Sequence, residues 1–354
     1  MSEKILELVR KRQKLWKHYL IILSIFSFLM FILSVRIGVM QISYGEIFWV
    51  LLKKLNLAYG SYNVKEAEEF VIVNFRFPRA FMSMLVGAAL AAAGCIFQAV
   101  FKNPLADPYV IGVSAGAALG AALAIVLGLS IILPGMSAIT STAFLFSLLT
   151  IYAVYRLASV NGSIPVTTLL LAGVMVSIFL SAIVSTLMVV AGKELHMLIF
   201  WLMGGFSYAR WPYVYVATPI IIPCIILTFL FSRRLNLLLL SEEEAQQLGV
   251  DVTKSIKGFL VLGSLLTAAA VSTSGSIGFI GLIIPHMMRI LVGPDHRILL
   301  PSSILAGTIF LTLCDILARV VFMPTELPVG VITALTGGPF FLYLLRKGKG
   351  SYVF

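Results

Sequence analysis

The chain has 354 residues, of which 60% are hydrophobic and only 12% are charged. A soluble globular domain carries about 25% charged residues, so charges this sparse cannot cover a water-facing surface, and two soluble domains are excluded. The net charge of +11 does not indicate a nucleic-acid partner, because the Lys and Arg residues are spread between apolar segments and form no basic stripe.

Ten apolar segments are long enough, or nearly so, to cross a bilayer as helices, which takes about 20 residues each. They are residues 19–35, 80–101, 109–127, 138–158, 168–190, 212–231, 258–274, 276–292, 301–322 and 328–345. The first is a span and not a signal peptide, because no small-residue cleavage site follows it. The predicted fold class is an all-α polytopic membrane protein, with residues 1–354 forming one transmembrane domain.

The distribution of Lys and Arg predicts how the chain is oriented. With the N-terminus in the cytoplasm, seventeen of the 26 basic residues lie in inner segments and nine in outer ones, as the positive-inside bias favours. We therefore expect a multi-pass protein of the cell membrane with both termini, the basic stretch 1–18 and segment 232–257 in the cytoplasm. Most of the outer basic residues lie in segment 36–78, where an apolar stripe between Ile42 and Leu55 predicts a short interfacial helix.

Two breaks interrupt the apolar pattern at unusual places. Residues 103–108 precede the third span on the inner side, and residues 273–278 separate the seventh and eighth spans on the outer side. Transporters built from inverted repeats carry interrupted segments at corresponding positions of their halves. Spans 2–5 and 7–10 are the candidate halves. The outer segment 191–211 carries Trp201, Tyr208 and Trp211, which suit a membrane interface.

A short polar helix is predicted on the cytoplasmic side. Ser241 can cap it, Glu244 occupies the reciprocal capping position, and Gly249 can end it. A helix this polar does not enter the membrane. Its composition suits either a simple connector or a docking element for a partner.

The chain carries few motifs for chemistry. It has no GxxxxGK[ST] motif for ATP, no HExxH motif and no Cys/His spacing for zinc. We therefore expect no cofactor and no metal site. Gly112–Gly116 matches GxSxG around Ser114, so an intramembrane serine hydrolase is one alternative. Asp315 lies inside the ninth span, one turn before Arg319, and either pairs with it or serves a proton-coupled secondary transporter.

A series of ordered motifs covers nearly the whole chain. They are RFPR (76–79), GAAL (87–90), GCIFQ (94–98), NPLADP (103–108), GVSAGA (112–117), LLLAG (169–173), WLMG (201–204), GFIGLIIPH (278–286), DHR (295–297), DILAR (315–319) and ELPVG (326–330). In these motifs the chain resembles the permease subunits of iron-siderophore, haem and cobalamin ABC importers.

The resemblance implies partners and a cargo. Such permeases have ten membrane helices, work as a dimer of permeases, and are driven by two cytoplasmic ATPase subunits, so this chain would not itself be an enzyme. An extracytoplasmic binding protein delivers the substrate, which is most often a ferric siderophore and otherwise haem, cobalamin or an oxyanion. No covalent chemistry, cofactor or nucleic acid is involved, and membrane lipid surrounds the subunits.

The resemblance also assigns candidate residues. It implies ATPase coupling by Ser241, Glu242, Glu243, Glu244, Ala245, Leu248 and Gly249. It implies an outer surface for the binding protein at Arg76, Arg79 and Arg319. The pathway would run between two permeases along the fifth helix, with an inner gate near Val166 and Thr167.

Overall fold

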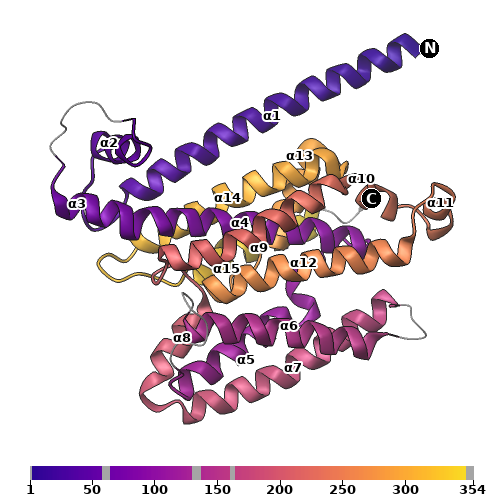
Figure 1. Ribbon diagram of the computed structural model, residues 1–354. Coiled ribbons are helices and arrows are strands. Elements are labelled where there is room, and N and C mark those ends of the chain that lie inside the picture. Colours follow the sequence, from indigo (N-terminus) through magenta and orange to yellow (C-terminus); the bar gives the residue numbers. More distant parts are fainter. Residues whose placement is uncertain (1, 58–63, 130–136, 160–163, 348–354) are drawn as a thin grey trace.

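The computed structural model describes residues 2–57, 64–129, 137–159 and 164–347, and these residues form helices and connecting turns without a strand. In chain order the elements are α1 (Ser2–Arg36), α2 (Tyr44–Lys54), α3 (Glu66–Val71), η1 (Ile72–Arg76), α4 (Phe77–Val100), η2 (Pro108–Ile111), α5 (Val113–Val126), α6 (Ala138–Ala158), α7 (Val166–Val190), η3 (Gly192–Glu194), α8 (Leu195–Met203), α9 (Trp211–Leu230), α10 (Ser232–Leu238), α11 (Glu242–Gln247), α12 (Val252–Ser274), α13 (Ile280–Val292), α14 (His296–Val320) and α15 (Val329–Lys347). The long helices form a bundle, with α2, α3 and α8 at one end and α10 and α11 at the other (Figure 1).

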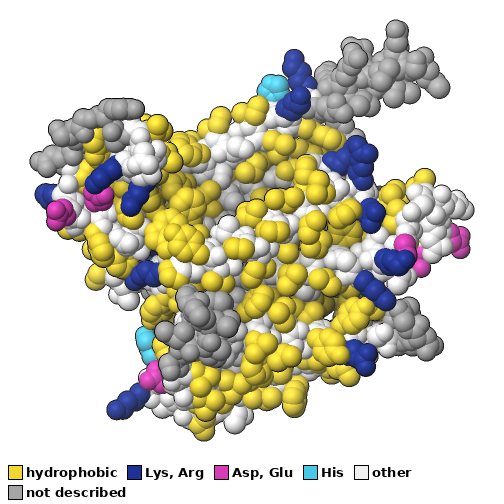
Figure 2. Space-filling view, viewed as in Figure 1, with side chains coloured by type: hydrophobic (Ala, Val, Ile, Leu, Met, Phe, Trp, Pro, Cys, Tyr) yellow, Lys and Arg dark blue, Asp and Glu magenta, His cyan; other side chains and the backbone are white. Residues whose placement is uncertain are grey.

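The described residues contain two groups of apolar helices, which differ in length. Seven are long and apolar enough to span a bilayer, and the three shorter apolar ones lie in α5, α13 and α15. The predicted all-α polytopic fold is thus confirmed. Figure 2 shows a broad apolar band across the visible face of the bundle, with most of the Lys and Arg side chains in view near its two ends. Such a band is what a protein surface in lipid requires.

The centre of the bundle is α4, which packs against α9, α12, α13 and α14. Its alanine- and glycine-rich sequence is almost wholly buried. A Cβ atom on Gly94 would overlap the backbone carbonyl of Gly281 in α13, and one on Gly87 would overlap that of Gly307 in α14. The glycines therefore allow backbones to touch directly, which is how membrane helices pack closely.

Helices α5 and α13 are shorter than the spans predicted at residues 109–127 and 276–292. They have 14 and 13 residues, or about 20 Å at 1.5 Å per residue, which is less than the roughly 30 Å hydrocarbon core. The segments before them meet inside the bundle: the Tyr109 hydroxyl donates to the Ile277 carbonyl at 2.8 Å, and the hydroxyls of Ser114 and Ser276 are 2.8 Å apart. The non-α segments 108–112 and 275–279, which directly precede α5 and α13, thus lie against each other where protein covers their irregular backbone.

The segment that follows α1 forms the predicted interfacial helix. Helix α2 begins at a capping box in which the Ser43 side chain accepts from the Glu46 amide and Glu46 accepts from the Ser43 amide. Lys53 at its end pairs with Glu69 of α3 at 2.7 Å. Residues 2–18 of the predicted basic N-terminus form the first part of α1. The side chains of residues 1–13 lie outside the described part of the structure.

Candidate functional site

Helix α11 has the capped form that the sequence predicts. The Ser241 hydroxyl accepts from the Glu244 amide at 3.3 Å, and the Glu244 carboxylate accepts from the Ser241 amide at 3.0 Å. The Ser241 hydroxyl and the Ser241 amide both donate to the Glu244 carboxylate, and these two hydrogen bonds lower its pKa. Ala245 is buried, whereas Glu242, Glu243 and Leu248 are exposed, and Gly249 follows in the left-handed conformation at a φ of 82°. A rigid helix with an exposed polar face therefore projects from one end of the bundle (Figure 1).

Polar side chains that the sequence analysis gave no role tie this segment to the bundle. The Lys102 ammonium, just after α4, donates to the Leu240 carbonyl at 2.6 Å. Asn236 of α10 donates to the Asp295 carboxylate at 2.9 Å and accepts from the His296 amide at 2.8 Å. Motion of α11 can therefore reach the ends of α4 and α14 through these contacts.

The charge of Asp295 is fixed at this junction. Partial burial alone would raise its pKa, but hydrogen bonds from Arg297 and Asn236 outweigh burial and lower it to about 2. The carboxylate is thus ionised throughout the neutral range. The DHR motif at 295–297 was a signal for this junction, but spacing alone could not pair it with Asn236.

Val166 and Thr167 lie in the first turn of α7, after Pro165. Thr167 is exposed and Val166 is half-buried. Within the most apolar 18-residue stretch of α7, only 11% of the residues are buried in the subunit. Most of this helix is thus free to face lipid or a second subunit, and its role in a gate stays a prediction.

Arg76 and Arg319 lie at the other end of the bundle, against the last turn of α1. Arg76 donates to the carbonyls of Val35 and Arg36 at 2.7 and 2.8 Å. Arg319 donates to the carbonyl of Ser34 at 3.0 Å. The last carbonyls of a helix have no partner within the helix, so the two guanidiniums close the end of α1.

Arg79 completes a buried ion cluster. Its guanidinium pairs with Asp315 at 3.0 Å and with Glu326 at 2.9 Å, and Asp315 pairs in addition with Arg319 at 3.1 Å. Asp315 is fully buried. The predicted pair of Asp315 with Arg319 is confirmed, whereas the second partner, Arg79, is distant in sequence and was missed.

The cluster corrects the expected exposure of the three arginines. Arg76 and Arg319 are only 8% and 6% exposed, and 13% of the Arg79 side chain is exposed. Carbonyl and carboxylate oxygens hold them below the surface, because a guanidinium is buried only where its donors find such acceptors.

The two rival chemistries find little support in the geometry. Ser114 lies beside Ser276, and no hydrogen bond joins it to a histidine among the described residues. Asp315 is held between the guanidiniums of Arg79 and Arg319 as part of the ion cluster.

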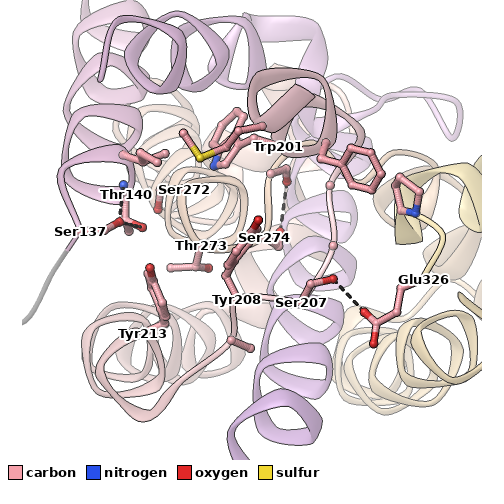
Figure 3. A pocket seen from close by; sticks show the side chains of 18 of the residues that line it. Ser137, Thr140, Trp201, Ser207, Tyr208, Tyr213, Ser272, Thr273, Ser274 and Glu326 are labelled. Atoms are coloured by element: carbon pink, nitrogen blue, oxygen red, sulfur yellow. Dashed lines mark hydrogen bonds between the residues drawn. The ribbon is translucent and has the colours of Figure 1, made fainter. Parts of the chain in front are cut away.

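An open cavity of about 550 Å³ lies near the ion cluster. Its wall comes from the start of α6, from α8 and the turn after it, from the end of α12, and from residues 325–328 (Figure 3). The Ser207 hydroxyl donates to Glu326 at 2.8 Å, which links the cavity wall to the cluster. Tyr208 and Trp201, expected only as interface residues, line it.

Comparison with known proteins agrees with this architecture. Residues 25–347 match the model of the FecCD transport family. The cobalamin import system permease protein BtuC of Halobacterium salinarum is 44% identical over 295 residues, 82% of this chain and 78% of that protein. The hemin transport system permease protein HmuU of Yersinia pestis is 40% identical over 81% of this chain and 86% of its own length.

A solved structure extends the match to the fold. It is a metal-chelate type ABC transporter in an inward-facing conformation, with a TM-score of 0.80 and 33% identity over 93% of this chain and 98% of that one. The chain belongs to the FecCD transport family and is a multi-span permease of the ABC-importer type.

Proposed function

We propose that this permease, paired with a second copy, moves a metal chelate into the cytoplasm by alternating access, driven by two separate ATPase subunits. The observation that carries the proposal is the structural match to a metal-chelate type transporter over 93% of the chain. The relatives named for cobalamin and hemin import support a large metal-containing ring or chelate as cargo. A ferric siderophore is the first cargo to test, followed by haem, cobalamin and an oxyanion.

The ATPase partner would dock on α11 and the residues around it. The supporting features are the exposed face of Glu242, Glu243 and Leu248 and the tethers through Lys102 and Asn236. Exposed basic residues flank this end of the bundle, including Arg156, Arg233 and Lys254. By the positive-inside bias, we place this end and both termini in the cytoplasm.

A second copy would cover the bare face of α7. Exposed large apolar side chains run along it, among them Leu171, Met175, Ile178 and Phe179. The mass of the purified permease in lipid nanodiscs tests this step. We expect two copies per particle, and a single copy that still supports ATP-driven uptake would contradict a pathway between subunits.

A binding protein would dock on the opposite end, over Arg76, Arg79 and Arg319. Their three positive charges face two negative ones, on Asp315 and Glu326, so this end keeps an excess of positive charge. Because the guanidiniums are buried, we propose that they attract an acidic partner through their field rather than by direct contact. At low salt, Glu326→Gln should speed association of the binding protein with the permease, whereas Glu243→Gln at the other end should not. An association rate that does not depend on salt would contradict this step.

Reconstitution tests the whole proposal. The permease, its ATPases and its binding protein are placed in liposomes, and uptake of a radiolabelled ferric chelate is measured with ATP or with a pH gradient alone. We expect uptake with ATP only. Uptake by the permease alone under a pH gradient would instead identify a proton-coupled secondary transporter.

A further inference from the structure

The open cavity at the end opposite α11 has no role in the account so far. It is bordered by two places where helices stop: Gly204 at the end of α8 and Gly275 at the end of α12, with φ of 70° and 68°. The Gly205 amide donates to the Ser274 carbonyl at 2.7 Å, which joins the two ends. Non-helical backbone in a membrane protein is tolerated where it is buried or lines a water-filled cavity, and transporters use such interrupted helices at their binding sites.

The volume suits a ligand. About 550 Å³ lies within the range of roughly 300–1,000 Å³ typical of small-molecule pockets. A larger chelate could seat one ring or arm there. Side chains from four separate parts of the chain converge on the space, as Figure 3 shows for Thr140, Trp201, Tyr213, Thr273 and Glu326.

The chemistry of the wall selects against negative charge. Aromatic rings of Phe200, Trp201, Tyr208 and Tyr213 line it together with serine and threonine hydroxyls. Among the lining residues that the structure describes, Glu326 is the one carboxylate, and none is Lys or Arg. Arg79 lies behind Glu326 and is already paired with it at 2.9 Å. A ligand in the cavity would thus meet ring faces, which attract cations, and no lysine or arginine among the described lining residues, whose one imidazole is that of His196.

We propose that this cavity is an entry site for an uncharged or cationic chelate with apolar rings or arms, and that it disfavours polyanionic chelates. The proposal rests on the proposed function and narrows its substrate class. The hydroxyls of Tyr208 and Tyr213 would donate hydrogen bonds to carbonyl or hydroxamate oxygens of the ligand, and the aromatic rings would pack on its apolar parts.

Direct binding tests the proposal. The full-length permease in nanodiscs is equilibrated with a radiolabelled uncharged iron(III) trihydroxamate and, separately, with an iron(III) tricatecholate trianion. We expect the trihydroxamate to bind at least about tenfold more tightly. Equal binding of the two probes, or binding of neither, would overturn the proposal.

Two variants locate the site. Thr273→Phe fills the cavity and should weaken trihydroxamate binding about tenfold or more, whereas Ser24→Phe on the exposed face of α1 should not. Tyr208→Lys adds a cation at an exposed position of the wall and should shift the preference toward the trianion by about tenfold. This gain of affinity is not expected from a misfolded variant. Unchanged preference in Tyr208→Lys would overturn the assignment.

Failure of this proposal can be told apart from failure of the proposed function. If ATP-driven uptake of a chelate persists unchanged in Thr273→Phe, the cavity is not its entry site, but the permease is still an importer. If the complete reconstituted system takes up no chelate, the proposed function fails.

Discussion

The two ends of the bundle are built by different physical means. At one end, Arg76, Arg79 and Arg319 are buried and hold α1, α4 and α14 together through Asp315 and backbone carbonyls. At the other end, α11 is capped within itself and exposes most of its surface. Buried charges are costly to separate, whereas exposed hydrogen bonds exchange readily with water. The difference predicts that the end with the ion cluster is fixed and that the end with α11 is free to receive a partner.

Removing the buried carboxylate should have the largest effect on stability. Asp315→Ala leaves Arg79 and Arg319 buried without their shared partner, and such a loss costs about 3–5 kcal/mol. We expect a large drop in the thermal midpoint, measured by circular dichroism in detergent. Glu242→Ala, an exposed acid on α11, is the control and should change stability by no more than about 0.5 kcal/mol. Equal midpoints for both variants would erase the contrast between the two ends.

The junction behind α11 should be intermediate. Asn236→Ala removes hydrogen bonds to Asp295 and to the His296 amide, which together are worth about 1–2 kcal/mol. Because the pKa of Asp295 is lowered to about 2, the anion favours the folded state above its ordinary pKa, and this contribution fades only as the pH falls toward 2. The cost of Asn236→Ala should therefore be constant across neutral pH, and a strong dependence there would contradict the assigned ion.

The helix cap should matter locally. Ser241→Ala deprives α11 of its cap at a cost of about 1 kcal/mol. Because α11 is short and mostly exposed, we expect faster amide exchange within residues 241–249 and no shift of the global midpoint. Ser241→Asp, which can still cap, should restore the exchange rate of the parent protein. A lower global midpoint in Ser241→Ala would mean that α11 is an integral part of the bundle.

The smallest effect on stability is expected at Leu248, although its functional effect should be large. The side chain is 60% exposed, so Leu248→Glu should change the free energy of unfolding by no more than about 0.5 kcal/mol. If α11 docks the ATPase, the same change should prevent assembly and stop substrate-stimulated hydrolysis. Thr253→Glu, at an exposed site in the first turn of α12, is the control. Normal assembly of Leu248→Glu would remove α11 from the coupling surface.

The parts that sequence could predict are those determined by local pattern. Apolar length located the spans, and the spacing of Ser241, Glu244 and Gly249 located the capped helix. The pairing of Arg79 with Asp315 and of Asn236 with Asp295 joins residues far apart in the chain, and no local pattern encodes it. The lengths of α5 and α13 were overestimated because hydropathy does not separate an α-helix from a short apolar segment of other conformation before it.

Hydrogen–deuterium exchange of the permease, alone and bound to its ATPases, tests the contrast between the two ends most directly. The account predicts that amides of residues 241–249 exchange quickly in the free permease and at least about tenfold more slowly in the complex. Amides of residues 34–40, 76–79 and 315–320 should exchange slowly in both states. Unchanged exchange at residues 241–249, with new protection confined to residues 34–40, 76–79 and 315–320, would contradict the account.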